Sequence, residues 1–389
     1  MSRRKGRILG ALACALVIGV GGCGESESAQ PTAGVSFDEL VQEASGQTLR
    51  WWMFGGDQRI NDYVDDVVAP AVRDAGFELE RVPVTDTAEA VQRVVSQRRA
   101  GETSGGAVDL IWINGENFAA GKENGLWLEG WVENLPNAAN VDLDDPSIAL
   151  DMQVPTEGQE APWSRAAFVF ASDPDDVPAS PRTFDELLDY ARENPGRVTY
   201  PAPPDFTGTS FVKQVVIAKG EDEAFDYLTE LRPLMWEDGE KFPKSEAELN
   251  QLFADGEVDF AMSFDPAFIE TAVRMGQFPE TTRPFLLEGG ALVNTSYVTI
   301  PADAENVEGA QVLANILLDP ELQAIKADPE VLGVPTVLDL ERLEPEERKA
   351  FDSATGSVYL LDDFGDTKDE LAADGVPPLE ERWKREILP

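Results

Sequence analysis

The sequence predicts an α/β fold of two lobes, and three observations support this prediction. The chain has 389 residues, which is enough for two domains of ordinary size. A hydrophobic content of 42% is typical of a globular chain that buries a sizeable core. From Thr48 onward, strand-like segments alternate with amphipathic helical segments, which is the order found in doubly wound sheets.

The first lobe begins with three strands separated by helices. The strands are expected over residues 49–54, 77–84 and 107–113. The helix after Asp57 has apolar residues at spacings of three and four, so one of its faces can pack on a sheet. Asp86 and Glu89 have the spacing of a capping box and indicate the start of the next helix. This βαβαβ order predicts parallel strands.

A second unit repeats the scheme and is followed by a helical tail. Its strands are expected over residues 166–171, 197–200, 258–262 and 292–300. Its helices are expected over residues 183–194, 207–219, 223–234, 245–254, 265–276 and 307–318. Asp265 and Pro266 pair an N-cap with a proline at the first helical position, which is a helix start signal. We expect strands near residues 163–170 and 291–300 to join the two lobes.

The first 22 residues have the pattern of a secretion signal. Residues 3–7 are mostly basic, and the apolar run over residues 8–20 is shorter than the ~20 residues that span a bilayer. The tetrapeptide from Val20 to Cys23 resembles a lipobox, in which the cysteine is lipidated and becomes the mature N-terminus. The alternative is a signal peptide or short anchor without a lipid. Residues 24–34 are rich in Ser, Glu and Gly, as in a flexible tether.

The composition excludes several classes of protein. Without histidine, the chain has no Ser–His–Asp triad and no histidine-ligated zinc site. Two cysteines cannot form a thiolate zinc site or a disulfide framework. The formal net charge is −42, and it becomes −46 when residues 1–22 with their four basic side chains are removed, which argues against nucleic-acid binding. Such acidity indicates solubility in an exposed or salty setting.

Several stretches resemble the solute-binding proteins of ABC importers. Residues 183–200 and 294–300 are similar to that class as a whole. Residues 86–93 and 108–118 are similar to its YnjB-type branch, which is related to thiamine, polyamine and iron binders. The resemblance extends from about Leu49 to Gln323. It implies a two-lobed periplasmic-binding-protein-like fold of type II, with a doubly wound mixed sheet in each lobe and a hinge of crossing strands.

The resemblance also implies an organisation and a function. The expected segments are a lipoprotein signal peptide at 1–22, a lipidated Cys23 and tether over 23–46, a first lobe of 47–164 with 298–333, and a second lobe of 165–293 with 334–389. The protein would be a monomer, held by its lipid on the extracytoplasmic face of the cell membrane. It would capture a small-molecule solute without a cofactor or metal and deliver it to the permease and ATPase subunits of the importer.

In open parallel sheets, ligands bind beyond the carboxyl ends of the strands. That rule, together with the hinge strands, selects the ligand-binding candidates Gly55, Gly56, Asn114, Glu116, Asn117, Trp163, Asp205, Phe206, Thr207, Thr209, Ser263, Asp265, Asn294 and Ser296. Structural alternatives stay open for some of them. Asp265, like Asp57, could be a helix N-cap, and Thr207 or Thr209 could cap the helix that they begin.

The candidate residues favour an organic cation as the solute. Glu116, Asp205 and Asp265 could pair with a positive charge, and nearby aromatic rings could stack on it. The alternative is an anionic group held by amides and hydroxyls at residues 207–210. Ferric iron is disfavoured, because the iron binders of this class typically use adjacent tyrosines, often with a histidine, and this chain has neither.

Two functions of other classes stay open on the sequence. A surface-anchored hydrolase of glycosidase type needs two carboxylates, for which Glu116 and Asp205 are the first candidates. The sequence holds no Gly-x-Ser-x-Gly, Walker A or His-Glu-x-x-His motif. A passive adhesion module would need neither a cleft nor a hinge. A binding protein would differ from an enzyme by saturable ligand stabilisation without turnover.

Overall fold

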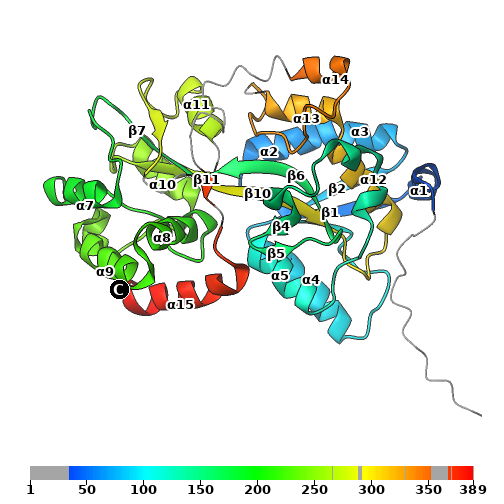
Figure 1. Cartoon of the computed structure of the whole chain (residues 1–389), viewed down its shortest axis with the longest axis horizontal. Coiled ribbons are helices and arrows are strands. Elements are labelled where there is room, and N and C mark those ends of the chain that lie inside the picture. The colour runs from blue at the N-terminus through cyan, green and yellow to red at the C-terminus, as the bar shows by residue number, and fades with distance from the viewer. Residues whose placement is uncertain are drawn as a thin grey trace, which may run out of the picture.

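The computed structural model describes residues 35–264, 266–287, 291–328, 330–351, 367–368 and 370–388. Figure 1 shows two lobes that lie side by side and are joined by the strands β6 (Glu160–Ala167) and β10 (Ala291–Thr299). The expected signal peptide and Cys23 lie outside the described residues. Within the described ranges, no helix is long and apolar enough to cross a membrane.

The first lobe is built on the larger sheet. Strands β1 (Thr48–Phe54), β2 (Glu78–Val84) and β3 (Leu110–Ile113) run parallel in the order β3-β1-β2, and β10 pairs antiparallel with β3. Its helices include α1 (Phe37–Ala44), α2 (Gln58–Tyr63), α3 (Ala69–Asp74), α4 (Thr87–Arg99), α5 (Gly115–Glu123), α12 (Val307–Leu317), α13 (Pro320–Ala327) and α14 (Pro345–Ala350). Asp86 caps α4 in a full capping box with Glu89. The parallel βαβαβ unit is therefore confirmed.

The second lobe has a smaller sheet surrounded by helices. Strands β7 (Val169–Ser172), β8 (Ala261–Ser263) and β9 (Arg283–Phe285) pair antiparallel in the order β8-β7-β9. Its helices are α7 (Phe184–Glu193), α8 (Phe206–Lys219), α9 (Glu221–Leu231), α10 (Glu246–Ala254) and α11 (Pro266–Arg274). The expected strand over residues 197–200 is wrong. The backbone of this segment accepts one hydrogen bond from the amide of Asp259 and one from that of Trp236. The Tyr200 ring stacks on Phe211 at a centroid distance of 4.4 Å, so side-chain packing replaces a strand ladder there.

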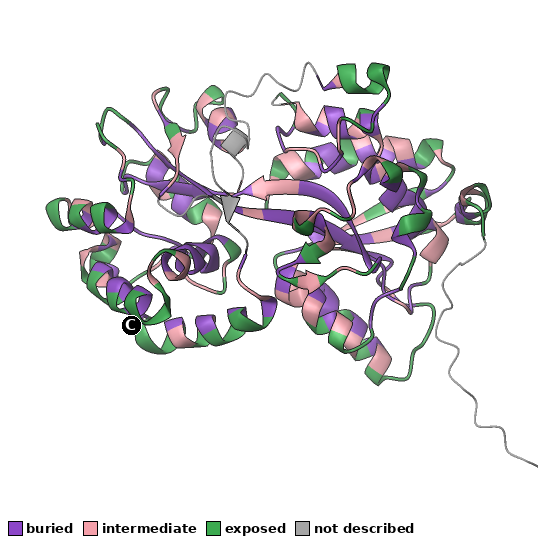
Figure 2. Cartoon of the chain, viewed as in Figure 1, coloured by how far each residue is buried: buried purple, intermediate pink, exposed green. Residues whose placement is uncertain are grey.

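Strands β6 and β10 form the connection between the lobes. They pair antiparallel from Glu160 opposite Thr299 to Ala167 opposite Val293. At one end of this ribbon Val298 is buried in the first core, and at the other end Leu292 is buried in the second. Figure 2 shows buried residues along both strands. A hinge of two crossing strands is thus the route between the lobes, as expected from the resemblance.

Two hydrophobic cores define what belongs to each lobe. Helix α1 buries Leu40 and Ala44 in the first core, so the chain is already folded within the segment expected as tether. The stretch 334–351, which we expected in the second lobe, also packs in the first core through side chains such as Leu338 and Phe351. The resemblance is thin after residue 328 and gave no reliable guide to this packing.

The C-terminal segment returns to the second lobe. Strand β11 (Thr367–Lys368) pairs parallel with β10, and a 3₁₀ turn (Ala373–Gly375) leads into α15 (Val376–Glu386). Helix α15 buries Leu379 and Trp383 in the second core. Smaller elements of the first lobe, α6 (Pro146–Ala149), β4 (Leu150–Asp151) and β5 (Val154–Pro155), precede the hinge strand β6.

Candidate functional site

The first lobe presents two loops at the carboxyl ends of its parallel strands. After β1, a Cβ atom on Gly55 would lie 2.6 Å from the Pro83 side chain, and one on Gly56 would lie 2.3 Å from the Phe54 ring. Packing against Pro83 thus requires glycine at position 55, whereas the Phe54 ring beside Gly56 is 40% exposed and can turn away. Asp57 caps α2 by accepting a backbone amide hydrogen at 2.8 Å, so the structural alternative for this residue is confirmed.

The second loop of the first lobe joins β3 to α5. Asn114 occupies the N-cap position of α5, but its side chain makes no capping hydrogen bond. Glu116 and Asn117 follow in the first helical turn, and both are half-buried. Burial raises the pKa of Glu116, while its own amide and the ammonium of Lys213 act in the opposite direction. The structure thus brings a carboxylate and two side-chain amides together at this strand end.

In the second lobe, the candidate residues lie at the start of α8. Asp205 is the N-cap and accepts the Gly208 amide hydrogen at 3.0 Å. The Thr207 hydroxyl donates to the Glu246 carboxylate at 2.6 Å. Asp205 is therefore a helix cap, and the Thr207 hydroxyl hydrogen is already used by a carboxylate.

The surroundings of the α8 N-terminus are acidic. The Thr209 hydroxyl donates to Glu380 of α15 at 2.6 Å. Burial raises the pKa of Glu246 to about 7, and it also raises the pKa values of Asp205 and Glu380. An anionic group arriving at this helix start would meet three carboxylates instead of free hydroxyl donors.

Carboxylates from both lobes gather around one buried lysine. Lys213 of α8 is 1% exposed and pairs with Glu370, with 2.7 Å between Nζ and Oε2. Glu116 of the first lobe feels the charges of Lys213 and Glu370, and Glu380 feels those of Lys213 and Glu116. Burial, with Glu116 and Glu370 nearby, raises the pKa of Asp151 to about 8. We call Glu116, Asp151, Glu370 and Glu380 the carboxylate cluster, and among the side chains that the structure describes its acidic groups outnumber the one ammonium, that of Lys213.

An exposed aromatic ring lies next to the carboxylate cluster. Phe206, the first residue of α8, is 36% exposed, and its ring packs on Phe264 at a centroid distance of 4.6 Å. The Lys213 ammonium lies 5.5 Å from the Phe206 ring centroid. The Phe206 ring therefore already takes part in a cation–π contact with a lysine of the protein itself.

The hinge ribbon carries three further candidates. Asn294 and Ser296 of β10 are buried, and within the described part of the chain neither side chain makes a hydrogen bond. Trp163 of β6 is only 2% exposed, because its ring packs in the first core against Trp51 and Trp112, at centroid distances of 5.7 and 4.9 Å. Trp163 therefore occupies the core in place of the expected cleft lining.

The loop after β8 is described only in part. Ser263 is buried and hydrogen bonds to the Glu246 carboxylate. Asp265 lies outside the described residues, so its expected role is neither supported nor opposed. The second lobe therefore adds Ser263 to the residues around the start of α8.

Sequence reasoning missed Lys213, Glu246, Glu370 and Glu380. Lys213 is the only charged residue in the apolar stretch 211–217, and that isolation is a signal of a buried ionic role. Glu246 follows Ser245, the N-cap of α10. Helix capping alone explains the local sequence, so Glu246 gives no separate signal of a role in the site. Glu370 and Glu380 come from an acidic tail, and only the folded chain brings them to α8.

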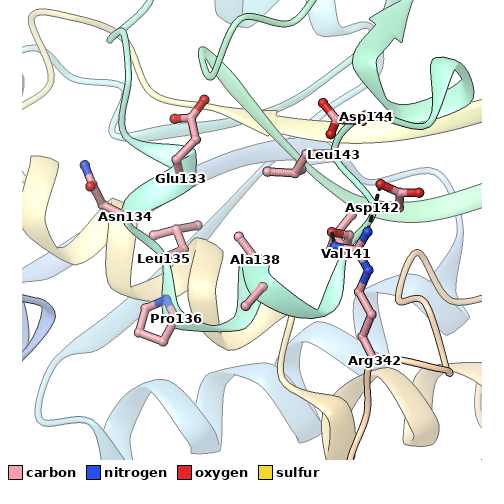
Figure 3. A pocket seen from close by; sticks show the side chains of 11 residues that line it. Glu133, Asn134, Leu135, Pro136, Ala138, Val141, Asp142, Leu143, Asp144 and Arg342 are labelled. Atoms are coloured by element: carbon pink, nitrogen blue, oxygen red, sulfur yellow. Dashed lines mark hydrogen bonds and ion pairs between the residues drawn. The ribbon is translucent and has the colours of Figure 1, made fainter.

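A separate pocket of about 450 Å³ lies on the first lobe (Figure 3). It is lined by residues 133–136, 138–139 and 141–144 together with Arg342, none of which is a predicted site residue. Arg342 points toward Asp142 and pairs with it at 2.9 Å. Across the described ranges, no group of three or more Asp, Glu, Cys or His side chains is arranged to hold a metal ion.

Comparisons with known proteins bear on family and fold. Residues 66–346 match the family described as bacterial extracellular solute-binding protein. The chain is 37% identical over 365 residues to the protein YnjB of Escherichia coli (strain K12), covering 89% of this chain and 92% of YnjB.

Solved structures of similar fold are more distant in sequence. An ABC transporter substrate-binding protein from Bradyrhizobium japonicum USDA 110 has a TM-score of 0.64 at 17% identity, covering 88% of this chain and 100% of that one. A candidate spermidine/putrescine ABC transporter from Listeria monocytogenes has a TM-score of 0.60 at 16% identity, with coverages of 87% and 98%. AfuA of Actinobacillus pleuropneumoniae, with fructose-6-phosphate bound, has a TM-score of 0.60 at 15% identity, with coverages of 88% and 99%. These likenesses confirm the periplasmic-binding-protein-like fold.

Proposed function

Because the chain belongs to the bacterial extracellular solute-binding proteins, we propose that it captures a small organic cation between its two lobes and delivers it to the permease of an ABC importer. Members of this family bind solutes outside the cytoplasm and are not enzymes, so the carboxylate-dependent hydrolase considered on the sequence is excluded. The finer parts of the proposal are the charge of the solute, its position and the partner.

The observation that carries the proposed charge is the carboxylate cluster. Glu116 comes from the first lobe, whereas Glu380 and Lys213 come from the second, and the three charges influence one another. Like charges in a partly desolvated site repel, so bringing the lobes together is unfavourable while acidic groups are in excess. A cationic solute would relieve this repulsion and favour the closed arrangement that a permease could recognise.

The aromatic surroundings support the same class of solute. Phe206 exposes its ring beside the Lys213 ammonium, where a second cation could also contact it. Thiamine-like and polyamine-like molecules both carry groups that suit a carboxylate next to a ring face. The Listeria monocytogenes protein of similar fold is named for spermidine and putrescine, which agrees with this choice without establishing it.

An anionic solute is the less favourable alternative. It would have to bind at the start of α8, where Asp205 already accepts the Gly208 amide hydrogen. The hydroxyls of Thr207 and Thr209 donate to Glu246 and Glu380. The donors that an anion needs are therefore engaged with carboxylates of its own charge sign.

The proposed solute class can be tested on the purified mature chain. Thermal unfolding would be followed with putrescine, spermidine and thiamine, with glutamate and fructose-6-phosphate as anionic controls. A cation at about 100 times its Kd should stabilise the folded protein by ~2.7 kcal/mol. Stabilisation by the anions alone would contradict the proposed charge.

We also propose that the protein works as a monomer held at the membrane through a lipid on Cys23. The support is the lipobox-like tetrapeptide from Val20 to Cys23. Cys23→Ala should leave the signal uncleaved or release the protein from the membrane fraction. Processing and fractionation like the wild type would contradict the lipid anchor.

A further inference from the structure

The C-terminal segment from Glu370 to Leu388 is fixed firmly to the second lobe. Helix α15 buries Leu379 and Trp383 in the second core, and Ile387 directly after the helix is buried there too. The Trp383 indole donates a hydrogen bond to the hydroxyl of buried Tyr200 at 2.9 Å. The start of this segment is therefore held at a defined place beside α8.

The same segment also touches the first lobe. The Ala373 amide donates to the Met152 carbonyl at 3.0 Å, and the Gln153 side chain donates to the Glu370 carbonyl at 3.0 Å. Ala373 and Val376 are buried together with Met152. Residues 370–376 thus lie where the second lobe meets the β4–β5 turn of the first lobe and α5, the helix that carries Glu116.

Two carboxylates of this segment face α8, and one of them has an unsatisfied oxygen. Glu370 is 7% exposed, and its Oε2 atom is paired with Lys213 at 2.7 Å. Its Oε1 atom is buried and accepts no hydrogen bond from the described part of the chain. A buried acceptor without a donor is unfavourable, so the Oε1 atom of Glu370 lacks a partner that carries N–H or O–H hydrogens.

Glu380 lies further along the same segment, in α15. Its Oε1 atom accepts the Thr209 hydroxyl hydrogen at 2.6 Å, and its carboxylate feels the charge of Glu116 across the lobes. Among the described side chains, one ammonium, that of Lys213, therefore stands near Glu116, Glu370 and Glu380. A second cationic group would supply both the missing charge and the missing donor.

We propose that Glu370 and Glu380 are solute-binding residues, which bind the cationic group of the solute together with Glu116 of the first lobe. Lys213 is then a positioning residue that fixes the Glu370 carboxylate through Oε2 and leaves Oε1 for the solute. This inference rests on the proposed function. It assigns part of the site to the chain's last twenty residues, which lie beyond the residues 66–346 that match the family.

The rival account is that both carboxylates only hold α15 in place. Glu380→Gln separates the two accounts, because glutamine can still accept the Thr209 hydrogen bond but carries no charge. Glu381→Gln is the matched control, since Glu381 is the next residue on the same helix and is exposed. Affinities for putrescine, spermidine and thiamine would be measured by calorimetry on the full mature chain, together with the ligand-free Tm.

We expect Glu380→Gln to raise the Kd of whichever cation binds by about tenfold or more, while its ligand-free Tm stays equal or rises. Glu381→Gln should change neither quantity. Glu370→Gln should weaken binding at least as strongly. This variant also leaves Lys213 without its ionic partner, so if it fails to fold, the result for Glu380→Gln decides.

The outcomes distinguish this inference from the proposed function. Cation binding by the wild type with an unchanged Kd in Glu380→Gln would overturn the assignment of the C-terminal segment and leave the proposed function standing. A lowered ligand-free Tm with unchanged Kd would identify the rival structural role. A wild type that binds none of the three cations would overturn both proposals.

Discussion

The loop after β3 in the first lobe and the start of α8 in the second lobe carry the same kinds of residue but use them differently. Each has a carboxylate and a phenylalanine at the first turn of a helix. In the first lobe, Asn114 leaves the helix uncapped and Phe118 is fully buried. In the second lobe, Asp205 caps the helix and Phe206 is exposed. A residue is free to bind a solute only where its own helix or core does not already use it.

The largest expected difference concerns the two phenylalanines. Phe118→Ala removes a fully buried ring and should lower the free energy of unfolding by about 3–5 kcal/mol. Phe206→Ala removes a partly exposed ring and should cost less stability, but it should weaken cation binding by about 0.5–1 kcal/mol. Urea unfolding and calorimetry measure the two quantities. Equal stability losses would contradict the different roles of the two rings.

The next largest effect is expected from Glu116, the carboxylate that does not cap its helix. Glu116→Gln removes a charge contact and should weaken cation binding by about 1.5–3 kcal/mol, roughly tenfold to more than a hundredfold in Kd. Glu123→Gln is the control, because Glu123 is exposed near the other end of the same helix. An unchanged Kd in Glu116→Gln, measured by calorimetry, would remove the first lobe from the site.

The capping carboxylate should behave in the opposite way. Asp205→Ala should lower the free energy of unfolding by about 0.5–2 kcal/mol, because the Gly208 amide loses its acceptor. Asp205→Asn should restore most of this stability, since asparagine also caps helices well. Both variants should bind the cation more tightly than Glu116→Gln does. A stable Asp205→Asn protein that has lost cation binding would show that this charge belongs to the site after all.

The last comparison concerns pH dependence, through one buried carboxylate near each region, Asp151 in the first lobe and Glu246 in the second. Asp151 lies near Glu116, Glu370 and Lys213, and its pKa is raised to about 8, while that of Glu246 is raised to about 7. A carboxyl group with a raised pKa binds protons more tightly when folded, so its contribution to stability falls as pH rises from ~4 through the folded pKa.

Carboxylates with lowered pKa values, such as Asp65 beside Arg81, contribute in the opposite direction, but their contribution changes only below about pH 4 and does not offset this decrease. Asp151→Asn should therefore flatten the decrease in Tm between pH 5 and about 8. Cation affinity should rise over the same range, since binding favours the ionised carboxylates. A steeper decrease in Asp151→Asn would show that the sign of its contribution is wrong.

The local parts of this structure could be predicted from the sequence, and the long-range parts could not. The spacing of apolar residues predicts β1, α4 and β10 because those signals lie within one segment. The strand expected over residues 197–200 fails because aromatic packing of Tyr200 outweighs its local propensity. Glu370 reaches Lys213 across 157 residues, and no pattern in one sequence reports such a contact.

The resemblance supplied the hinge and the family, which periodicity could not have done. The rule that ligands bind beyond the carboxyl ends of parallel strands selected the loops that contain Glu116 and Asp205, but it could not say which of the two carboxylates caps a helix. That distinction depends on hydrogen bonds such as the one from the Gly208 amide. Neither the rule nor the resemblance selected Glu370 and Glu380, because the resemblance is thinner after residue 328.

The central claim is that a cation closes the two lobes by joining carboxylates of both. Small-angle X-ray scattering on the mature chain, with and without saturating spermidine, putrescine or thiamine, tests this claim most directly. We expect a bound cation to reduce the radius of gyration of the wild type, and the same concentration to leave the Glu116→Gln/Glu380→Gln double variant unchanged. An equal reduction in the double variant, or no reduction in a wild type that clearly binds the cation, would contradict the account.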